Sequence, residues 1–405
     1  MKLELVTHRQ NIAALAGRWD ELAREDARDG FFRTSGWYLS WLDHVRPDAQ
    51  PFVVVARDSE GNIAGLAPLC RVRHREHWLP MDGVSLGGRE VVSGEYLDYL
   101  SVPHARTEVL CGVMEFLWKE ASRWDLLITG EVFAGGDLHR ALESFAERKG
   151  LAIRVQEERV CPFIELPPTF EQYLAAGFNQ KRRKEIKRQT RVILEDFGAQ
   201  IEVYSRPEEI AENLDSLVQL HTGRWQSANQ TGNMGRPGFV RFLYHICDAP
   251  PAGALPRLYV MKHQGQPVAA LLVFYFGQSA LAYSIGRDPG CAISHLSPGF
   301  AILVRSIQDA IQQGYRYYDF LRGDERFKFH LTKSVRKTIT ILVGRSPSAR
   351  AYLQALALKD TLKQRFPRLW ARLAGADAGP NPAGKEEVAG APAAARPDTE
   401  SHATV

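Results

Sequence analysis

Two stretches of this chain share a strand–turn–strand pattern, and their turn glycines stand 204 residues apart. The stretches are PFVVVARDSEGNIAGLAPLC, which turns at Gly61, and RLYVMKHQGQPVAALLVFYF, which turns at Gly265. Apolar, β-branched runs on either side of a glycine-containing turn predict a β-hairpin. After each hairpin the pattern predicts a strand, a helix and a further strand. The repeat therefore predicts two copies of one fold built from mixed sheets with helices on their faces.

The first copy begins with a predicted strand at 3–6 and two predicted helices. The first helix has Ile12, Leu15, Trp19 and Leu22 at spacings of three and four residues, and Ser35 can cap the second helix. After the hairpin the pattern predicts a strand at 96–102, a helix at 107–122, a strand at 125–129 and a helix that ends near 149.

The second copy repeats this order with a longer helical section. The pattern predicts a strand at 163–166, helices at 169–197 and 208–226, the second hairpin, a strand at 281–285, a helix at 299–313, a strand at 317–321 and a late strand at 339–343. The string Trp124-Asp125-Leu126-Leu127 recurs as Tyr318-Asp319-Phe320-Leu321. This recurrence suggests that Asp125 and Asp319 hold corresponding places.

These patterns predict an α/β fold with mixed sheets and four segments. The boundaries are a first domain at 1–157, a second domain at 158–346, a C-terminal helix at 347–374 and a disordered tail at 375–405. The tail contains nine Ala, four Gly and four Pro, and Val388 and Val405 are its only aliphatic side chains apart from alanine. Such a segment buries too little apolar surface to offset the entropy of ordering it.

Composition excludes several classes of protein. The five cysteines are scattered, which fits neither a disulfide framework nor a CxxC metal site. The N-terminus lacks a signal-peptide pattern, and the longest apolar run, 268–276, is far shorter than the roughly 20 residues that span a bilayer. We therefore expect a cytoplasmic protein without a transmembrane helix and without a bound metal.

A basic segment at 181–191 carries seven Lys or Arg side chains and one Glu. Apolar residues before, within and after it fall roughly on one helical face, so it predicts an amphipathic helix with a basic outer surface. Three interpretations stay open: a solvated face, docking to an anionic acceptor or membrane surface, and RNA binding. No aromatic residues interleave with the basic ones as a base-stacking platform would require, which disfavours nucleic acid.

A more specific signal lies between residues 297 and 328. Ser297-Pro298-Gly299 precedes a predicted helix, and the string DFLRGDE at 319–325 is followed by Lys328. This arrangement resembles the CelD-like branch of the GNAT acyltransferases, which is related to the FemAB peptidyltransferases. The resemblance extends over most of residues 30–345 and includes KRRKEIKR at 181–188 and LHTGRW at 220–225. It implies acyl transfer from acyl-CoA to an amine or hydroxyl, often in bacterial polysaccharide or envelope biosynthesis.

The donor half of this resemblance has a physical basis at residues 297–300. Acyl-CoA carries a pyrophosphate, and a helix N-terminus offers backbone N–H groups and a positive dipole end to such an anion. Ser297 can cap the helix, Pro298 suits its first turn and Gly299 lets the backbone approach closely; Phe300 completes the predicted donor site. The alternative is that this segment only starts a helix.

Thioester aminolysis needs a neutral attacking amine, donors for the developing oxyanion and a proton for the leaving thiolate. Asp319 and Asp324 are carboxylates at or just past the end of a predicted strand, and Tyr283 and His295 are weaker acid candidates. Asp319 could instead be structural, and Asp324 could cap the helix that follows.

The predicted substrate-binding residues come from both copies. Arg322 and Lys328 could neutralise an anionic acceptor, or could pair with nearby carboxylates. Glu95 and Asp98, in SGEYLDYL, resemble an acceptor-side strand that could equally be an edge strand with outward polar residues. The resemblance adds Arg224 and Trp225 to this set.

Three functions follow from these patterns. The first is a GNAT acyltransferase with acyl-CoA in the second copy and an amine-bearing, possibly anionic acceptor in the groove between the copies. The second is a FemAB-like transferase that uses aminoacyl-tRNA. The third is a catalytically degenerate pair of domains that acts as a binding module in polysaccharide assembly.

Overall fold

A computed structural model describes residues 1–25, 28, 30–74, 80–119, 124–227 and 232–366. In the first part of the chain the main elements are β1 (Lys2–Val6), α1 (Arg9–Ala14), α2 (Ala16–Glu25), α3 (Ser35–His44), β2 (Gln50–Arg57), β3 (Ile63–His74), β4 (Met81–Leu86), β5 (Leu100–Ser101), α4 (Arg106–Lys119), β6 (Leu126–Phe133), α5 (Asp137–Lys149) and β7 (Ala152–Glu165).

The later elements are α6 (Phe170–Gly177), α7 (Gln180–Arg191), β8 (Gln200–Tyr204), α8 (Pro207–Ser227), α9 (Phe239–Asp248), β9 (Leu255–His263), β10 (Gln266–Phe276), β11 (Ser279–Arg287), α10 (Pro298–Gln312), β12 (Tyr317–Asp319), α11 (Arg326–Phe329), β13 (Val335–Gly344) and α12 (Pro347–Arg365). The 3₁₀ segments that matter below are Glu90–Val92 and Ser294–Leu296.

The strands of the described chain form one hydrogen-bonded series in the order β1-β2-β3-β4-β6-β13-β7-β12-β11-β10-β9-β8, with β5 paired to β3. The series has the same pattern when it is followed inward from either end. From one end, the antiparallel strands β1, β2, β3 and β4 are followed by β6, which pairs with β4 in parallel. From the other end, the antiparallel strands β8, β9, β10 and β11 are followed by β12, which pairs with β11 in parallel. The predicted fold class, mixed α/β with two similar halves, is confirmed by this topology.

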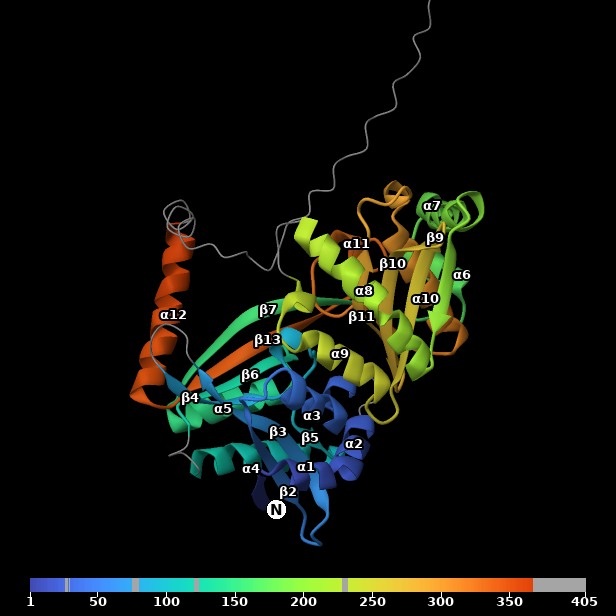
Figure 1. The fold of residues 1–405 in the computed structure, drawn as a ribbon. Coiled ribbons are helices and arrows are strands. Elements are labelled where there is room, and N and C mark those ends of the chain that lie inside the picture. Colours follow the sequence, from blue (N-terminus) through green and yellow to red (C-terminus); the bar gives the residue numbers. More distant parts are fainter. Residues whose placement is uncertain (26–27, 29, 75–79, 120–123, 228–231, 367–405) are drawn as a thin grey trace, which may run out of the picture.

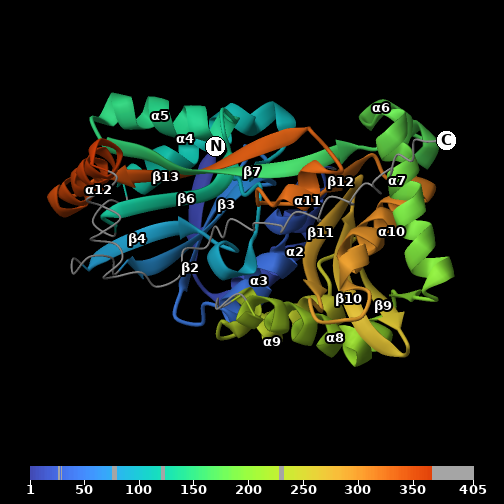
Figure 2. The same ribbon diagram turned by 90° about the horizontal axis from the view of Figure 1, so that it is seen from above.

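The two long strands β7 and β13 join the halves. β13 lies between β6 and β7, so it completes the sheet of the first half although it belongs to the end of the chain. The last residues of β7 pair with β12 in the second half. Figure 2 shows β7 and β13 side by side as they cross from one half toward the other. The predicted boundary between residues 157 and 158 therefore falls inside β7, and neither half has a complete sheet without the other.

Helices α6, α7 and α10 pack on one face of the second-half sheet and form a buried cluster with it. Helices α8 and α9 pack on the opposite face, and their buried residues belong to the same cluster as the core of the first half. Gly238, at the start of α9, lies so close to the first half that a Cβ atom would stand 1.8 Å from the His44 carbonyl oxygen. The two halves therefore share a core.

Several predicted boundaries change where polar groups satisfy helix ends. The first predicted helix breaks at Leu15, and the next is capped by Thr34, whose hydroxyl accepts from the Trp37 N–H, rather than by Ser35. The predicted helix 169–197 is divided because Asn179 caps α7 through a hydrogen bond from the Arg182 N–H. The pattern also missed β8 and α9, and only Leu100–Ser101 of the predicted strand 96–102 pairs.

The proposed correspondence between Asp125 and Asp319 is wrong. Asp125 comes one residue before β6 begins, whereas Asp319 is the last residue of β12. The two strings, at 124–127 and 318–321, are similar in sequence, but the first lies at the start of β6 and the second lies at the end of β12.

Helix α12 begins where the prediction placed it (Figure 1), and it contacts the sheet through Tyr352 and Leu353, which are buried, and through Asp360, which pairs with Arg154 of β7. The predicted disordered tail lies outside the described residues. Across the described residues, the structure contains no helix with the length and apolarity that a bilayer-spanning segment needs.

Candidate functional site

The parallel strands β11 and β12 pair over only three residues, from Ser279 opposite Tyr317 to Leu281 opposite Asp319. β11 continues to Arg287, while β12 ends at Asp319. Beyond this point no strand among the described residues pairs with β11 on that side, so its polar groups are available to a ligand.

A β-bulge lies where the two strands part. The register of β11 against β10 passes from Ala282 opposite Val273 to Ser284 opposite Leu272, which leaves Tyr283 as the extra residue. Bulges redirect the side chains that they carry. The Tyr283 hydroxyl donates to the carbonyl oxygen of Val92 in the first half at 2.7 Å, and burial raises the pKa of this phenol well above its ordinary value. Tyr283 therefore stays protonated and links the halves beside the unpaired edge of β11.

The loop after β11 opens the N-terminus of α10. Ser297 occupies the N-cap position of α10, as predicted, but it has a φ of +59° and its side chain makes no capping hydrogen bond. A Cβ on Gly299 would lie 3.6 Å from Ile285 Cδ1 and 3.8 Å from Arg287 Cδ, which are ordinary contacts. The fold does not require glycine here, but a larger side chain would fill the space between α10 and the end of β11.

The other site residues predicted near this loop are Pro298 and Phe300, which follow Ser297, and His295, which precedes it. Pro298 and Phe300 are buried in the first turn of α10, and the Arg182 guanidinium of α7 lies over the Phe300 ring at 5.5 Å. His295 is exposed and packs edge-on against Phe197.

The carboxylate of Asp319 is 1% exposed and fully engaged in contacts. It accepts from the Tyr96 hydroxyl at 2.8 Å and from the Leu321 N–H at 2.7 Å, and it forms an ion pair with Arg336 of β13. These partners come from the first half, from the turn after β12 and from the shared strand. Asp319 therefore anchors the end of β12.

Lys328 holds the turn that follows. Its ammonium donates to the Arg322 carbonyl at 2.6 Å and lies 3.0 Å from a carboxylate oxygen of Glu325. Leu321 and Gly323 have positive φ angles in this turn. Asp324 is exposed, and the residue at the N-cap position of α11 is Glu325. Of the residues predicted around this turn, Lys328 contacts the protein's own main chain and Asp324 faces solvent.

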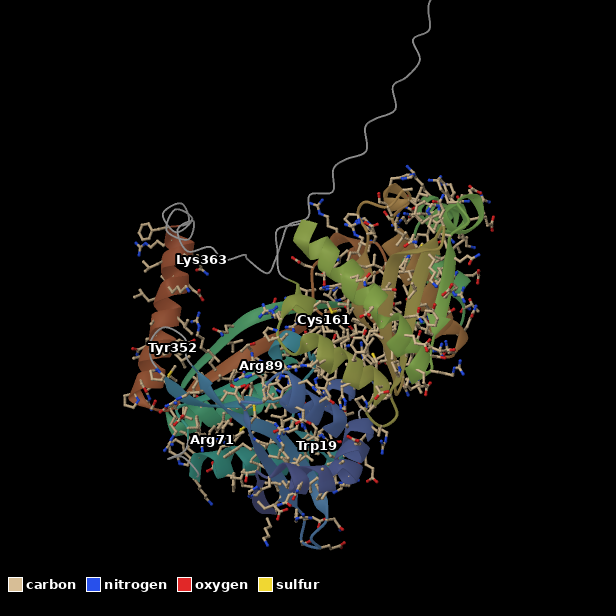
Figure 3. All side chains as sticks on the ribbon, viewed as in Figure 1. Trp19, Arg71, Arg89, Cys161, Tyr352 and Lys363 are labelled. Atoms are coloured by element: carbon tan, nitrogen blue, oxygen red, sulfur yellow. The ribbon has the colours of Figure 1, made fainter. Side chains whose placement is uncertain are left out.

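Arg322 and Glu95, both predicted to bind substrate, bind each other. Arg322 Nε lies 2.9 Å from Glu95 Oε1, and the Glu95 side chain is fully buried. Glu95 also accepts from the Thr338 hydroxyl at 3.2 Å. Burial raises the pKa of Glu95 to about 7, although the Arg322 charge opposes this rise. Cys161, labelled in Figure 3, lies beside Glu95 at the place where the halves meet.

A second carboxylate, Glu131, shares the Arg322 charge. Arg322 Nη1 lies 3.4 Å from Glu131, and Arg89 Nε lies 3.1 Å from it. Burial acts to raise the pKa of Glu131, but Arg89 and Arg322 together hold it below its ordinary value. Sequence reasoning missed Thr338 and Arg336 because it assigned β13 to the second half alone, and it missed Glu131 because the predicted strand ended at residue 129.

Asp98 lies apart from this cluster and lines a cavity of about 320 Å³ in the first half, together with Arg33, Leu97, Arg106 and residues 132–138. Asp98 pairs with Arg106 at 2.6 Å. The cavity lies near the N-terminal ends of α4 and α5, so backbone N–H groups and charges of both signs surround it.

Helix α8 covers the end of β11. A Cβ on Gly286 would stand 2.7 Å from the His221 nitrogen, so the two backbones are in close contact. Burial, with the nearby charge of Arg224, lowers the pKa of His221 to about 4. Arg224 is partly buried one turn further along α8, and the side chain of Trp225 lies outside the described residues.

Comparison with known proteins places this geometry in a known fold. Residues 180–329 match the model of the GNAT acetyltransferase domain. The crystal structure of FemX covers 84% of this chain and 97% of its own at 10% identity and a TM-score of 0.56. A conserved protein of unknown function from Bacteroides thetaiotaomicron covers 85% and 100% at 12% identity and a TM-score of 0.55.

The C-terminal domain of a putative lysylphosphatidylglycerol synthetase from Agrobacterium fabrum covers 87% of this chain and 97% of its own, at 11% identity and a TM-score of 0.50. No curated protein matches the chain. At these identities the solved structures show the fold alone. The expected GNAT-like acyltransferase fold is confirmed, and the matched segment contains α7, β11, α10 and β12.

Proposed function

We propose that this protein is an acyltransferase that moves an acyl group from acyl-CoA, bound at the second half, to an amine or hydroxyl of an acceptor. The observation that carries this proposal is the parting of β11 and β12 beside the uncapped N-terminus of α10. This feature lies within the segment that matches the GNAT acetyltransferase domain. A helix N-terminus attracts phosphate, and the unpaired edge of a strand can hydrogen-bond an extended amide chain.

The proposed donor site uses Ser297, Pro298, Gly299 and Phe300 at the start of α10. The pyrophosphate of acyl-CoA binds the N–H groups of this turn, and the amide-containing arm follows the unpaired edge of β11 toward Tyr283. The corresponding place in the first half is filled by its own chain, because the Leu97 N–H donates to the Glu131 carbonyl at 3.0 Å where β4 and β6 part. This difference favours a single donor site.

The proposed reaction is direct attack on the thioester. The acceptor nitrogen or oxygen forms a bond to the acyl carbon, the carbon–sulfur bond breaks, and the departing thiolate takes up the proton that the acceptor loses. Tyr283 is the proposed proton donor to sulfur; its O–H, which donates to the Val92 carbonyl in this structure, would have to turn toward the thioester. Asp324 and His295 are exposed and stay candidates for receiving the acceptor's proton, whereas Asp319 positions the end of β12.

The acceptor is proposed to be an amine-bearing molecule of the class that the CelD-like resemblance implies, a polysaccharide or envelope precursor, or a small metabolite. Asp98, which pairs with Arg106 at the first-half cavity, is the proposed carboxylate for an ammonium group of the acceptor, and Arg224 of α8 is a second proposed acceptor contact. We also propose that the basic segment 181–191 contacts an anionic acceptor or membrane surface. Nucleic acid has no stacking platform there.

Titration calorimetry with coenzyme A and acetyl-CoA tests the donor site directly. We expect binding to the full chain, followed by release of free thiol when a panel of amino sugars and amines is added to acetyl-CoA. Boiled protein and a reaction without acceptor are the controls. An absence of binding across short and long acyl chains would overturn the proposal.

A FemAB-like transfer from aminoacyl-tRNA is the second candidate, because the FemX structure matches nearly its whole length to this chain. That function predicts product with charged tRNA and none with acetyl-CoA. A third result, donor binding without turnover of any acceptor, would indicate a binding module.

A further inference from the structure

Helix α12 has apolar side chains on two different sides. Tyr352 and Leu353 are buried against the sheet. Leu358 and Leu362 are 60% and 41% exposed, and Phe366, the C-cap residue, follows at the same spacing and is 48% exposed. At about 100° per residue, Leu358 and Leu362 point away from the side that carries the buried pair. We call Leu358, Leu362 and Phe366 the outer stripe.

The side of α12 opposite the outer stripe is fixed to the body of the protein. Asp360 forms an ion pair with Arg154 of β7, and it is the only acidic side chain of this helix. Figure 3 labels Tyr352 near the first turns of α12 and Lys363 near its end. The helix is therefore held on its sheet side along its length, which leaves the outer stripe facing outward.

Positive charge accompanies the outer stripe. Lys363 and Arg365 lie in the last turn of α12. The sequence from 361 to 376 contains four Lys or Arg side chains and no Asp or Glu, and it includes Trp370. Exposed leucine and phenylalanine combined with lysine, arginine and tryptophan are typical of segments that lie in the interface of an anionic bilayer.

Charge also argues against a second copy of the chain as the occupant of the outer stripe. Two copies that paired through it would bring the same basic residues together. Asp360, the one carboxylate of α12, is held on the sheet side by Arg154, so the helix has no carboxylate to offer to the Lys363 and Arg365 of another copy. An anionic surface complements this charge.

The other basic helix, α7, lacks the apolar component. Its one aliphatic side chain, Ile186, is 1% exposed, so α7 presents charge without an apolar face. Figure 1 shows α7 and α12 at opposite sides of the molecule. A bilayer contact through α12 would therefore leave α7 and the N-terminus of α10 away from the lipid.

We propose that the outer stripe of α12 docks on the surface of an anionic phospholipid bilayer. Leu358, Leu362 and Phe366 enter the interfacial region, and Lys363 and Arg365 lie beside lipid phosphates. The helix lies along the surface and does not cross the bilayer. This inference goes beyond acyl transfer and does not depend on which donor or acceptor the protein uses.

Flotation of the full chain with lipid vesicles tests the inference. We expect binding to vesicles of phosphatidylcholine with about 30% phosphatidylglycerol, and much weaker binding to phosphatidylcholine alone. The test variant is Leu358→Gln, and the matched control is Leu255→Gln at the start of β9, where the leucine is 55% exposed. The test variant should weaken binding by about fivefold or more and the control by less than about twofold.

The charged part of the surface is tested by Lys363→Gln with Arg365→Gln. This variant should bind the anionic vesicles less tightly, and its difference from the unaltered protein should shrink as salt is added. All three variants change exposed residues, so their melting temperatures should stay within a few degrees of the unaltered protein.

Failure of the unaltered protein to bind anionic vesicles would overturn the inference, and so would equal losses in Leu358→Gln and Leu255→Gln. Sedimentation velocity provides an independent readout. A dimer that Leu358→Gln dissociates, with vesicle binding unchanged, would also overturn the inference because a second copy would then occupy the outer stripe.

Discussion

Glu95 and Arg322 are 227 positions apart in the sequence and meet in the interior of the molecule. Each was predictable as a polar residue near the end of a strand, and each was expected to face a substrate. Their contact was not predictable, because it depends on which strands pair across the two halves. Removing a charged group from water costs free energy unless a partner compensates. The Glu95–Arg322 pair therefore compensates buried charge inside the protein and does not face a substrate.

The raised pKa of Glu95 predicts a specific pH dependence of stability. The folded pKa of about 7 lies above the ordinary 4.5, so the unfolded chain releases the proton first as pH rises. The folded state therefore loses stability between about pH 4.5 and 7 relative to a Glu95→Gln variant, by at most about 3 kcal/mol. Urea unfolding of both proteins across this range measures the difference.

Glu131→Gln provides the matched control, because the pKa of Glu131 is lowered and the sign reverses. The stability of the unaltered protein relative to this variant should increase as pH rises through the ordinary glutamate range. Parallel curves for both variants would contradict the assignment of these charges.

Gly299 makes a prediction about ligand binding rather than folding. Its first side-chain carbon would meet only ordinary contacts, so Gly299→Ala should leave the melting temperature within a few degrees. Gly299→Leu reaches further from this buried position and tests the space beside it. The longer side chain would fill the space between α10 and β11 and should weaken coenzyme A binding by about tenfold or more. Gly17→Leu, at an exposed glycine of α2 with no atom within 4 Å of its Cβ, is the control for an added leucine. A large stability loss at Gly299 with unchanged affinity would contradict this role.

At the scale of elements, the short strand β12 depends on contacts from three other segments. Asp319 connects it to Tyr96, to the following turn and to Arg336. The sequence could identify a carboxylate at the end of a strand. It could not distinguish a reacting group from an anchoring group, because that difference lies in partners contributed by distant segments.

Asp319→Asn separates the two roles. Removing the charge leaves Arg336, which is 13% exposed, without its carboxylate, so the free energy of unfolding should fall by about 3 kcal/mol or more. Asp324→Asn changes an exposed residue and should alter stability by less than about 0.5 kcal/mol. Urea unfolding compares the variants. An Asp319→Asn protein of normal stability that lost only activity would favour direct catalysis.

Most elements were predictable because apolar spacing and turn residues identify strands and helices locally. The hairpins, α5, α10 and β13 are found close to their predicted positions. The pairing of β13 was not predictable, because its apolar run Ile339–Val343 describes a buried strand but not the neighbours of that strand. The insertion of β13 into the first-half sheet and the core that the two halves share depend on long-range contacts. Apolar periodicity describes only local structure and does not encode them.

At the scale of the whole molecule, the halves cannot be separated without breaking sheets. A chain that ends before Val335 lacks β13 and leaves the facing edges of β6 and β7 unpaired. We expect this truncation to lose cooperative unfolding and to aggregate, because exposed strand edges pair with other chains. A chain that ends at Phe366 keeps every described strand and should unfold cooperatively. Circular dichroism melts and sedimentation velocity compare the two. A monomeric, cooperative fold of the shorter chain would contradict a shared sheet.

The position of β13 also affects synthesis on the ribosome. β6 and β7 are made early, but the strand that separates them appears about 170 residues after β7. At elongation rates of about 5–20 residues per second this delay is on the order of ten seconds, during which the nascent chain has two strands with unpaired edges. If these strands pair with each other, β13 can insert only after that hairpin opens. The final step of folding in the first half therefore waits until β13 has been made, and chaperone demand should be highest while the second half is being made.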